Sequence, residues 1–200
     1  MVYGVYAAPP AGTAERIQAA ARKLLDRRGA EAVTMRRVAE AVGITPMALY
    51  RHFANRAGLL NALADAGFEE LAAGIGGARL PAAPERRLMK ILDLFLDFAL
   101  ERPRLFELMF LTRRPGARQF PGDFRAGKSP TARFSAAALE EGMRQGVFRQ
   151  DDAWEIVFAT GAMLQGLVML YLGGRFAASE PELRALCRRA FRRYLNGIRA

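Results

Sequence analysis

The segment from Thr34 to Phe53, TMRRVAEAVGITPMALYRHF, constrains the fold more than any other part of the chain. Its first half repeats apolar residues at offsets of three, four and seven, the spacing of one helix face: Met35, Val38, Ala39 and Val42. Thr34 precedes them as an N-cap, and Gly43 follows where a left-handed residue ends a helix. Thr45-Pro46 then opens a second helix, predicted to run to about His52. This pattern predicts a helix-turn-helix, whose second helix enters the major groove of DNA.

The outward face of that second helix is predicted to read DNA. With Leu49 and Phe53 turned inward, Tyr50, Arg51 and His52 are left to bind phosphates or bases. The alternative is a purely structural helix pair, because a glycine corner of this kind occurs in many all-α proteins. We expect the DNA-binding residues to be Thr34, Arg36, Arg37, Thr45, Pro46, Met47, Ala48, Tyr50, Arg51, His52 and Arg56.

The order of residues in this region resembles a known family. GITPMALYRHFANRAGLL, from Gly43 to Leu60, closely resembles the DNA-binding signature of the tetracycline-repressor (TetR) family. In that family the core precedes a short polar turn and a fourth helix that starts with a basic residue; here Asn55 is the expected N-cap and Arg56 the expected phosphate contact. The family's acidic capping-box residue is missing, since Ala57 stands in its place. ALERPRLFELMF, from Ala99 to Phe110, is similar to a sensor-domain subgroup of the same family, over a shorter stretch.

The charge and the reactive residues point to binding rather than catalysis. Thirty basic and twenty acidic residues leave a formal charge of +10, which favours an anionic partner, nucleic acid or a membrane surface. The lone Cys187 fits a reducing cytoplasm and is expected to pack as a small apolar residue. His52, the lone histidine, is already placed in the reading helix. With no metal-ligand spacing, phosphate-binding loop or catalytic triad in the sequence, we expect no enzymatic activity, metal or cofactor.

The whole chain is predicted to be all-α, with about nine helices. A flexible N-terminal arm is expected over residues 1–12, a three-helix DNA-binding domain over 13–60, and an effector-binding and dimerisation domain over 61–200. Thr13 is expected to cap the first helix, and the fourth helix is expected to run toward Gly74, where a loop marked by Gly74, Gly76, Gly77, Pro81 and Pro84 separates the two parts. Residues 113–130, rich in Pro, Gly and Arg, are predicted to be a mobile connection.

The last two helices are predicted to form a dimer interface. The run from Ile156 to Leu172 has no charged residue, and Ala159, Ala162 and Gly166 permit close approach of a second backbone. A helix-turn-helix of this size buries too little DNA surface to be selective alone, so we expect a homodimer on a palindromic operator. We place its four-helix bundle in Trp154–Leu172 and Pro181–Ile198. Two alternatives remain: both helices are the core of one subunit, or the run spans a membrane. The second is disfavoured because the run is short of about 20 residues and contains Gln165.

Large apolar side chains in the second domain predict a cavity, although such residues more often form a core. The resemblance implies a small effector that releases DNA, and the apolar lining predicts a hydrophobic one. Its expected contacts are Phe95, Phe98, Phe106, Met109, Phe110, Phe134, Phe158, Met163 and Gln165. The sequence thus favours a ligand-responsive repressor of transcription. The competing hypotheses are a constitutive architectural DNA binder and a helical carrier of hydrophobic ligands.

Overall fold

A computed structural model describes residues 12–200 of the chain. Of the arm predicted over residues 1–12, only Gly12 belongs to this part, so that prediction lies outside the described residues. Residues 12–200 form ten α-helices and one short 3-10 helix, with no β-strand beyond an isolated bridge between Phe148 and Arg199. The all-α fold is therefore confirmed for this part of the chain. These residues divide into two compact units, one ending at Leu63 and one beginning at Ala64.

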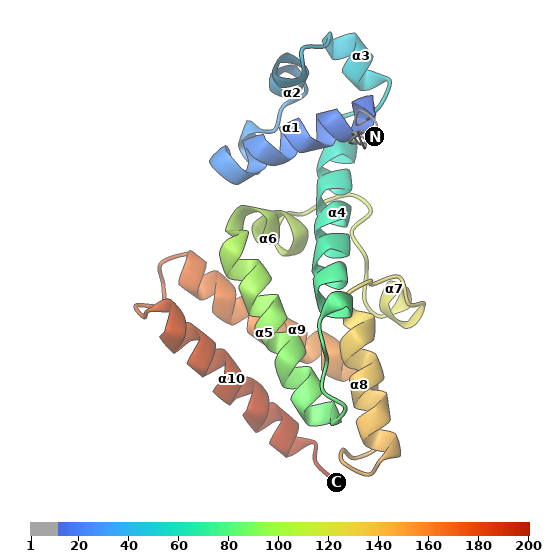
Figure 1. Cartoon of the computed structure of the whole chain (residues 1–200), viewed down its shortest axis with the longest axis vertical. Coiled ribbons are helices and arrows are strands. Elements are labelled where there is room, and N and C mark those ends of the chain that lie inside the picture. The colour runs from blue at the N-terminus through green and yellow to red at the C-terminus, as the bar shows by residue number, and fades with distance from the viewer. Residues whose placement is uncertain (1–11) are drawn as a thin grey trace, which may run out of the picture. The chain divides into compact units, whose positions relative to one another are not determined.

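The first unit is built from α1 (Thr13–Arg28), a 3-10 turn (Ala30–Ala32), α2 (Met35–Val42), α3 (Pro46–Tyr50) and the start of α4 (Arg56–Gly77) (Figure 1). Gly12 is the N-cap of α1, and its N–H donates to the Glu15 carboxylate at 3.0 Å. Thr13 is the first helical residue rather than the cap that we expected. The side chain that satisfies an end group of α1 comes from Glu15 instead, in its first turn.

The corner between α2 and α3 forms as its local signals predict. Thr34 Oγ1 accepts the Arg37 N–H at 3.3 Å, and Thr45 Oγ1 accepts the Ala48 N–H at 3.2 Å, so both helices have a side-chain N-cap. Gly43 has a φ of 76°, in the left-handed region where other residues are disfavoured. Its N–H and that of Ile44 both donate to the Ala39 carbonyl, which closes α2. The helix α3 ends at Tyr50, two residues earlier than predicted.

One small core joins the helices of the first unit. Apolar residues at the predicted spacing in α1 and α2 are buried, and Leu49 anchors α3 from the other side with no exposed surface. The buried members from these three helices are Ile17, Ala21, Leu25, Met35, Val38, Ala39 and Leu49. A helix of five residues is not stable by itself, so α3 depends on the buried Leu49 and on its N-cap Thr45 for its orientation.

The second unit contains the rest of α4 and six further helices (Figure 1). These are α5 (Pro84–Glu101), α6 (Pro103–Phe110), α7 (Gly122–Arg125), α8 (Ala132–Arg144), α9 (Ala153–Leu172) and α10 (Glu180–Gly197). One predicted helix end was wrong. The helix α4 continues through Gly74 and Gly76 to Gly77, because flanking residues such as Leu71 and Ile75 pack against the core. Within residues 113–130, predicted to be a mobile connection, the four residues of α7 are helical.

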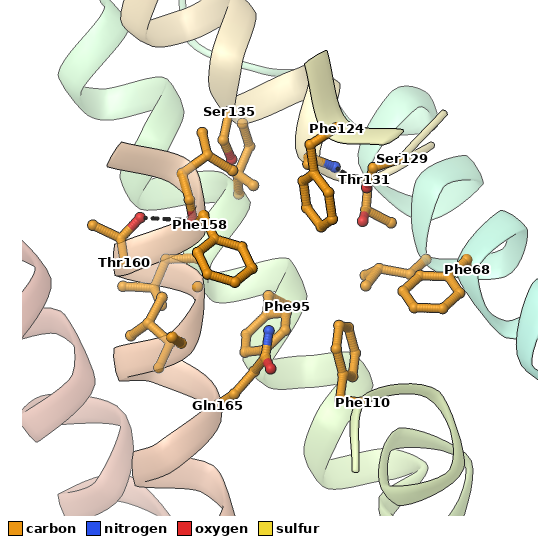
Figure 2. A pocket seen from close by; sticks show the side chains of 18 of the residues that line it. Phe68, Phe95, Phe110, Phe124, Ser129, Thr131, Ser135, Phe158, Thr160 and Gln165 are labelled. Atoms are coloured by element: carbon orange, nitrogen blue, oxygen red, sulfur yellow. Dashed lines mark hydrogen bonds between the residues drawn. The ribbon is translucent and has the colours of Figure 1, made fainter. Parts of the chain in front are cut away.

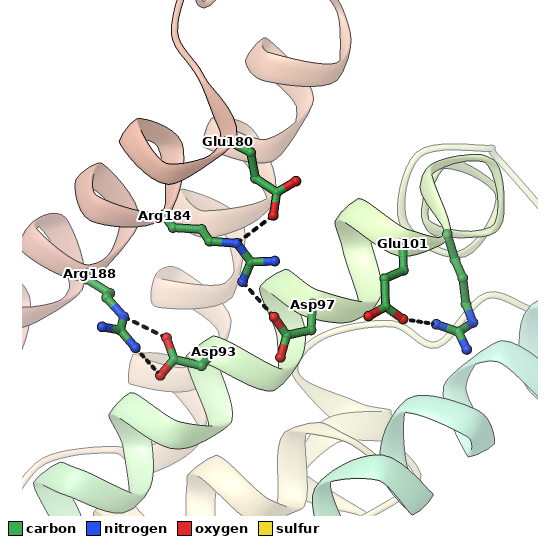
Figure 3. Close-up of polar contacts among 7 residues, drawn as sticks. Asp93, Asp97, Glu101, Glu180, Arg184 and Arg188 are labelled. Atoms are coloured by element: carbon green, nitrogen blue, oxygen red, sulfur yellow. Dashed lines mark hydrogen bonds and ion pairs between the residues drawn. The ribbon is translucent and has the colours of Figure 1, made fainter.

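Buried side chains of α5, α8, α9 and α10 meet in a common core, with α5 packed on α8 and α10, and α9 on α8 and α10. Ion pairs fasten α10 to α5: Arg188 contacts Asp93 at 2.5 Å, and Arg184 contacts Asp97 at 2.6 Å (Figure 3). Just beyond the end of α10, Arg199 contacts Glu85 in the first turn of α5 at 2.7 Å. Residue numbers in these pairs rise along α10 as they fall along α5, so the two helices are antiparallel and the pairs favour one register.

Among residues 12–200, α9 is the one helix long and apolar enough to cross a membrane, with a mean hydropathy of 1.6. The core helix of a soluble protein passes the same test of length and composition. Only 22% of this apolar window is buried within the chain. The helix therefore presents an apolar face that the described part of a single chain does not cover.

Candidate DNA-reading surface and ligand cavity

The outward face of α3 is the most exposed apolar and aromatic surface of the first unit. Met47 is 69% exposed and Tyr50 is 47% exposed, whereas Leu49 between them is completely buried. Thr45, Pro46, Arg51 and His52 are also exposed, and Ala48 is half-buried. A large side chain such as Met47 gains nothing from solvent exposure, so this face is suited to contact with another molecule.

The two capping threonines remain able to bind a phosphate. Each uses an oxygen lone pair to accept a backbone N–H, which leaves its hydroxyl hydrogen free to donate. Thr34 is half-buried and Thr45 exposed. Both lie at the N-terminus of a helix, where partial positive charge also attracts an anion. The helix ends of α2 and α3 therefore combine oriented donors with the appropriate sign of charge.

Three arginines of the predicted surface have no partner among residues 12–200. Arg36 and Arg37, in the first turn of α2, and Arg51, after α3, are exposed and make no ion pair or side-chain hydrogen bond within that part of the chain. Basic residues near a helix N-terminus oppose the helix dipole and do not stabilise the helix. Their placement is better explained by an external anion such as a phosphate backbone.

Arg56 differs from the other predicted DNA contacts. Its guanidinium turns back into the first unit, where Nε donates to the Val33 carbonyl at 2.8 Å and Nη2 to the Ala30 carbonyl at 2.7 Å. Glu31 adds a carboxylate 3.5 Å from Nη2. Arg56 therefore has a structural role that we did not predict, while Nη1 makes no hydrogen bond among residues 12–200 and its side chain is 39% exposed. Sequence patterns could not reveal this, because the accepting carbonyls lie more than twenty residues away.

The second unit encloses a cavity of about 360 Å³ (Figure 2). Phe68 of α4 and Phe158 of α9 stand on opposite sides, with Phe95 of α5 and Phe110 of α6 between them. Its polar groups come from two parts of the chain: Thr160 and Gln165 belong to α9, and the others lie between the end of α6 and the start of α8, namely Thr112, Arg114, Arg118, Ser129, Thr131 and Ser135. A cavity of this size, apolar with a few polar groups, is typical of a site for a small organic molecule.

Five of the nine predicted ligand contacts line this cavity: Phe95, Met109, Phe110, Phe158 and Gln165. The Gln165 side chain projects into the cavity (Figure 2) and has no hydrogen-bond partner among residues 12–200. Its amide can therefore donate to and accept from a bound molecule.

The other four predicted ligand contacts lie elsewhere, and for them the prediction is corrected. Phe106 is completely buried behind the wall, with its ring 4.8 Å from that of Phe110. Phe98 is buried and packs under the Arg102 guanidinium, and Phe134 packs under that of Arg133. Met163 is packed against the helical core. Helical periodicity identified these side chains as inward-facing, but it does not distinguish a core from a cavity wall.

The segment after α6 contributes residues that the sequence analysis missed. Arg114, Arg118, Phe124 and Ser129 all line the cavity. Phe124 lies edge-to-face with Phe158 at 5.7 Å, and Phe120 stacks on Phe158 at 4.3 Å, which fixes the segment against α9. Aromatic residues within a stretch rich in proline and glycine were the available signal of this packing.

The uncovered face of α9 carries small residues flanked by large apolar ones. Ala159 and Ala162 are exposed and Gly166 is half-buried, at spacings of three and four residues. Met169 and Leu170, further along the helix, are 41% and 45% exposed. This pattern permits close packing of a second helix along the same face.

The two units together define a class of protein. A helix-turn-helix with a solvent-exposed second helix, followed in the same chain by a helical unit that encloses a cavity, is the architecture of DNA-binding transcriptional regulators. Residues 17–63 match the family described as bacterial regulatory proteins, tetR family, and residues 88–194 match the family described as tetracyclin repressor-like, C-terminal domain. The chain belongs to the TetR family of transcriptional regulators.

Solved structures share the fold over nearly the full chain. A protein of unknown function from Rhodococcus sp. RHA1 is similar with a TM-score of 0.76 and 24% identity, covering 96% of this chain and 98% of its own. PfmR, a TetR family transcriptional regulator from Thermus thermophilus, is similar with a TM-score of 0.64 and 23% identity, over 95% of this chain and 99% of the PfmR chain. The fatty acid degradation regulator FadR from Bacillus halodurans is similar with a TM-score of 0.69 and 16% identity, over 92% of this chain and 99% of the FadR chain. No curated protein matches the chain.

Proposed function

We propose that this regulator binds a palindromic operator as a homodimer and is released from it by a small hydrophobic effector, which makes it a ligand-responsive repressor. The observation that carries the proposal is the face of α3, where Met47 and Tyr50 are exposed around the buried Leu49. The exposed Arg36, Arg37 and Arg51 add cations without partners among residues 12–200. We propose that these residues, with Thr34, Thr45, Pro46, Ala48 and His52, form the DNA-reading surface of a domain over residues 13–60.

The cavity supports an effector over constitutive DNA binding. A closely packed helical unit would serve a purely architectural DNA binder, whereas this unit contains a cavity of about 360 Å³ with many apolar side chains in its lining. The helix α4, which begins at Arg56, also supplies Phe68, Leu71 and Ile75 to the cavity wall. We propose that a bound effector shifts the position of this helix and thereby favours a state that binds DNA less well. A domain over residues 61–200 would then combine effector binding with dimerisation.

The dimer interface is proposed along α9 and α10. The exposed Ala159, Ala162, Met169 and Leu170 form an apolar strip that a partner's copy of the same strip can cover. A two-fold interface of this kind explains the exposed apolar surface of α9 without a membrane. The proposed cellular site is the cytoplasm, where the operator is accessible, and the proposed action is by binding alone, without catalysis or a cofactor.

Fluorescence anisotropy with the protein's own promoter DNA tests the reading surface. Tyr50→Ala and Arg51→Ala should each weaken binding by about 1 kcal/mol or more, the scale of a lost charge-assisted or phosphate contact. Arg27→Ala is the matched control, because Arg27 is an exposed arginine on α1 of the same unit. Unchanged binding in both the Tyr50→Ala and the Arg51→Ala variants would refute the assignment and favour the ligand-carrier hypothesis.

Light scattering at micromolar concentration tests the dimer. Ala162→Arg should convert the dimer to a monomer, because a charged side chain would be buried in the middle of the apolar strip. Ala73→Arg, at an exposed alanine of α4, should leave the mass unchanged. A wild-type protein that is monomeric at this concentration would contradict the proposed interface.

A further inference from the structure

One end of the cavity is lined by two arginines. Arg114 is only 8% exposed, and its Nε and Nη2 donate to the carbonyls of Leu108 and Met109 at 3.1 and 3.3 Å. Its guanidinium thereby satisfies carbonyls at the C-terminal end of α6. Arg118 lies above the Phe68 ring, with 5.1 Å between the guanidinium carbon and the ring centroid. The Phe68 side of the cavity is therefore cationic.

The position of Arg118 is fixed by three contacts. Its Nε donates to the Lys128 carbonyl at 2.8 Å, its Nη1 lies 3.2 Å from the Asp65 carboxylate, and the Phe68 ring supports its flat face. Its second terminal nitrogen, Nη2, makes no hydrogen bond within residues 12–200. A guanidinium held in this way is preorganised, so a ligand that uses its remaining donors loses little side-chain entropy.

The charges at this end do not cancel. The described residues that line the cavity include Arg114 and Arg118 but no Asp or Glu. Asp65 is the nearby carboxylate that both arginines share, since it contacts Arg118 and interacts favourably with Arg114. The neighbouring Asp123 is already paired with Lys128 at 2.9 Å. Asp123 also interacts favourably with Arg118, so Arg114, Arg118 and Lys128 are grouped with two carboxylates, and the cluster is net positive.

A cation in a partly desolvated site is costly, and burial lowers the pKa of Arg114 accordingly. A bound monoanion would offset that cost, whereas a neutral ligand would not. The opposite side of the cavity, with Phe95, Phe158 and the Gln165 amide, has no charged group that would repel an apolar body. The cavity therefore has a cationic end and an apolar end.

We propose that the effector is an amphipathic monoanion whose carboxylate or similar head group binds Arg118, next to Arg114, and whose aromatic or aliphatic body extends toward Phe158 and Gln165. This inference rests on the proposed function, in which the cavity is the effector site. It deepens that function by naming the chemical class of the effector. Arg118 is the specificity-determining residue, and Arg114 both shapes the cavity end and contributes to its positive charge.

Two fluorescent probes with the same ring framework test the charge preference. Anilinonaphthalenesulfonate carries an anionic group, and N-phenylnaphthylamine is the same framework without it. We expect the wild-type dimer to bind the sulfonate at least about tenfold more tightly, a difference of about 1.4 kcal/mol. Arg118→Gln should remove most of this preference while the affinity for the neutral probe changes less than about twofold. Arg118→Lys, which keeps the charge without the planar fork, should retain part of it.

Arg113→Gln is the matched control, because Arg113 is exposed, lies in the same segment and does not line the cavity. It removes the same charge and should leave both affinities unchanged. Equal affinity for the two probes in the wild type, or an equal loss of both in Arg118→Gln, would overturn the inference. Unchanged binding of the neutral probe also shows that the variant retains a folded cavity.

A second measurement uses displacement, which restricts the readout to the cavity. Octanoate should displace the neutral probe from the wild type at a concentration about tenfold lower than octanol, and the two should become equivalent in Arg118→Gln. If octanol is the better competitor, the anionic head group is refuted. Probe binding is measured without DNA, so failure of the operator test would contradict the regulatory function and not this preference. A protein that binds DNA but neither probe would contradict both the preference and the proposed effector site.

Discussion

The guanidinium of Arg56 is bonded to the carbonyl of Val33, with 2.8 Å between Nε and the oxygen. The residue that starts α4 therefore holds the loop that leads into α2, and a second bond to Ala30 at 2.7 Å strengthens this attachment. Charge-assisted bonds to backbone carbonyls are stronger than neutral ones. Arg56 thus fixes the loop before α2 to the start of α4.

Replacement of Arg56 should therefore reduce the stability of the fold. We expect Arg56→Ala to lower the free energy of unfolding by about 1–3 kcal/mol, because two backbone carbonyls lose a charged donor. Arg51→Ala should leave stability within about 0.5 kcal/mol of the wild type, as expected for an exposed side chain. Thermal denaturation measures both. The salt dependence of DNA binding tests the alternative role of Arg56. If Arg56→Ala is as stable as the wild type and its plot of log K against log salt concentration is less steep by about one, Arg56 contacts a phosphate.

The ion pairs between α5 and α10 predict a salt-sensitive contribution to stability. Asp93 accepts Arg188 Nε at 2.7 Å and Nη2 at 2.5 Å, a bidentate geometry that favours a measurable coupling (Figure 3). Because Arg188 is exposed, the coupling should be only about 0.2–1 kcal/mol.

A double-mutant cycle with Asp93→Asn and Arg188→Gln measures this coupling by chemical denaturation. It should shrink in high salt, where exposed charges are screened. The exchange Asp93→Arg with Arg188→Asp should recover part of the stability lost by either single reversal. No coupling in low salt would show that apolar packing alone sets the register of α10.

A close approach at Gly142 predicts a strong effect of a single methyl group. A Cβ at this position of α8 would lie 2.3 Å from Cδ2 of Phe148, a ring that is 1% exposed. Since the ring is enclosed by the core, Gly142→Ala should cost about 1–3 kcal/mol of stability. Gly74→Ala is the matched control, because a Cβ there meets nothing within 4 Å. Helix propensity alone should make that variant about 0.5–1 kcal/mol more stable. Equal effects of the two substitutions on thermal stability would contradict the packing.

Cys187 is predicted to be unreactive in the folded protein. It has no exposed surface, and burial raises the pKa of its thiol to about 11 from the ordinary value of 9.0. At pH 8 an aromatic disulfide reagent should modify it only after denaturant is added. The raised pKa also means that the folded state holds the proton longer than the unfolded state. Its contribution to stability should be complete below pH 9 and should be lost as the pH rises toward about 11. Cys187→Ser should weaken this alkaline dependence, and rapid modification of the native thiol would contradict the burial.

The sequence by itself determined the elements whose causes are local. Thr34, Gly43 and Thr45 act through bonds to residues at most five positions away, so their types and spacing suffice to predict the corner between α2 and α3. The buried faces of the short helices follow from periodicity for the same reason. Once Leu49 was assigned to the core, the other side chains of α3 were predicted to form its exposed face.

Only the tertiary structure decided the uses of the long side chains. Arg56 and Arg118 have similar sequence contexts, each a basic residue near a predicted turn, yet one bonds carbonyls from the loop before α2 and the other lines a cavity above Phe68. Phe106 and Phe110 lie four residues apart on one helix, and only Phe110 lines the cavity. The physical reason is that a guanidinium or a phenyl ring reaches partners set by how helices pack. Those partners are distant in sequence, and no local preference encodes them.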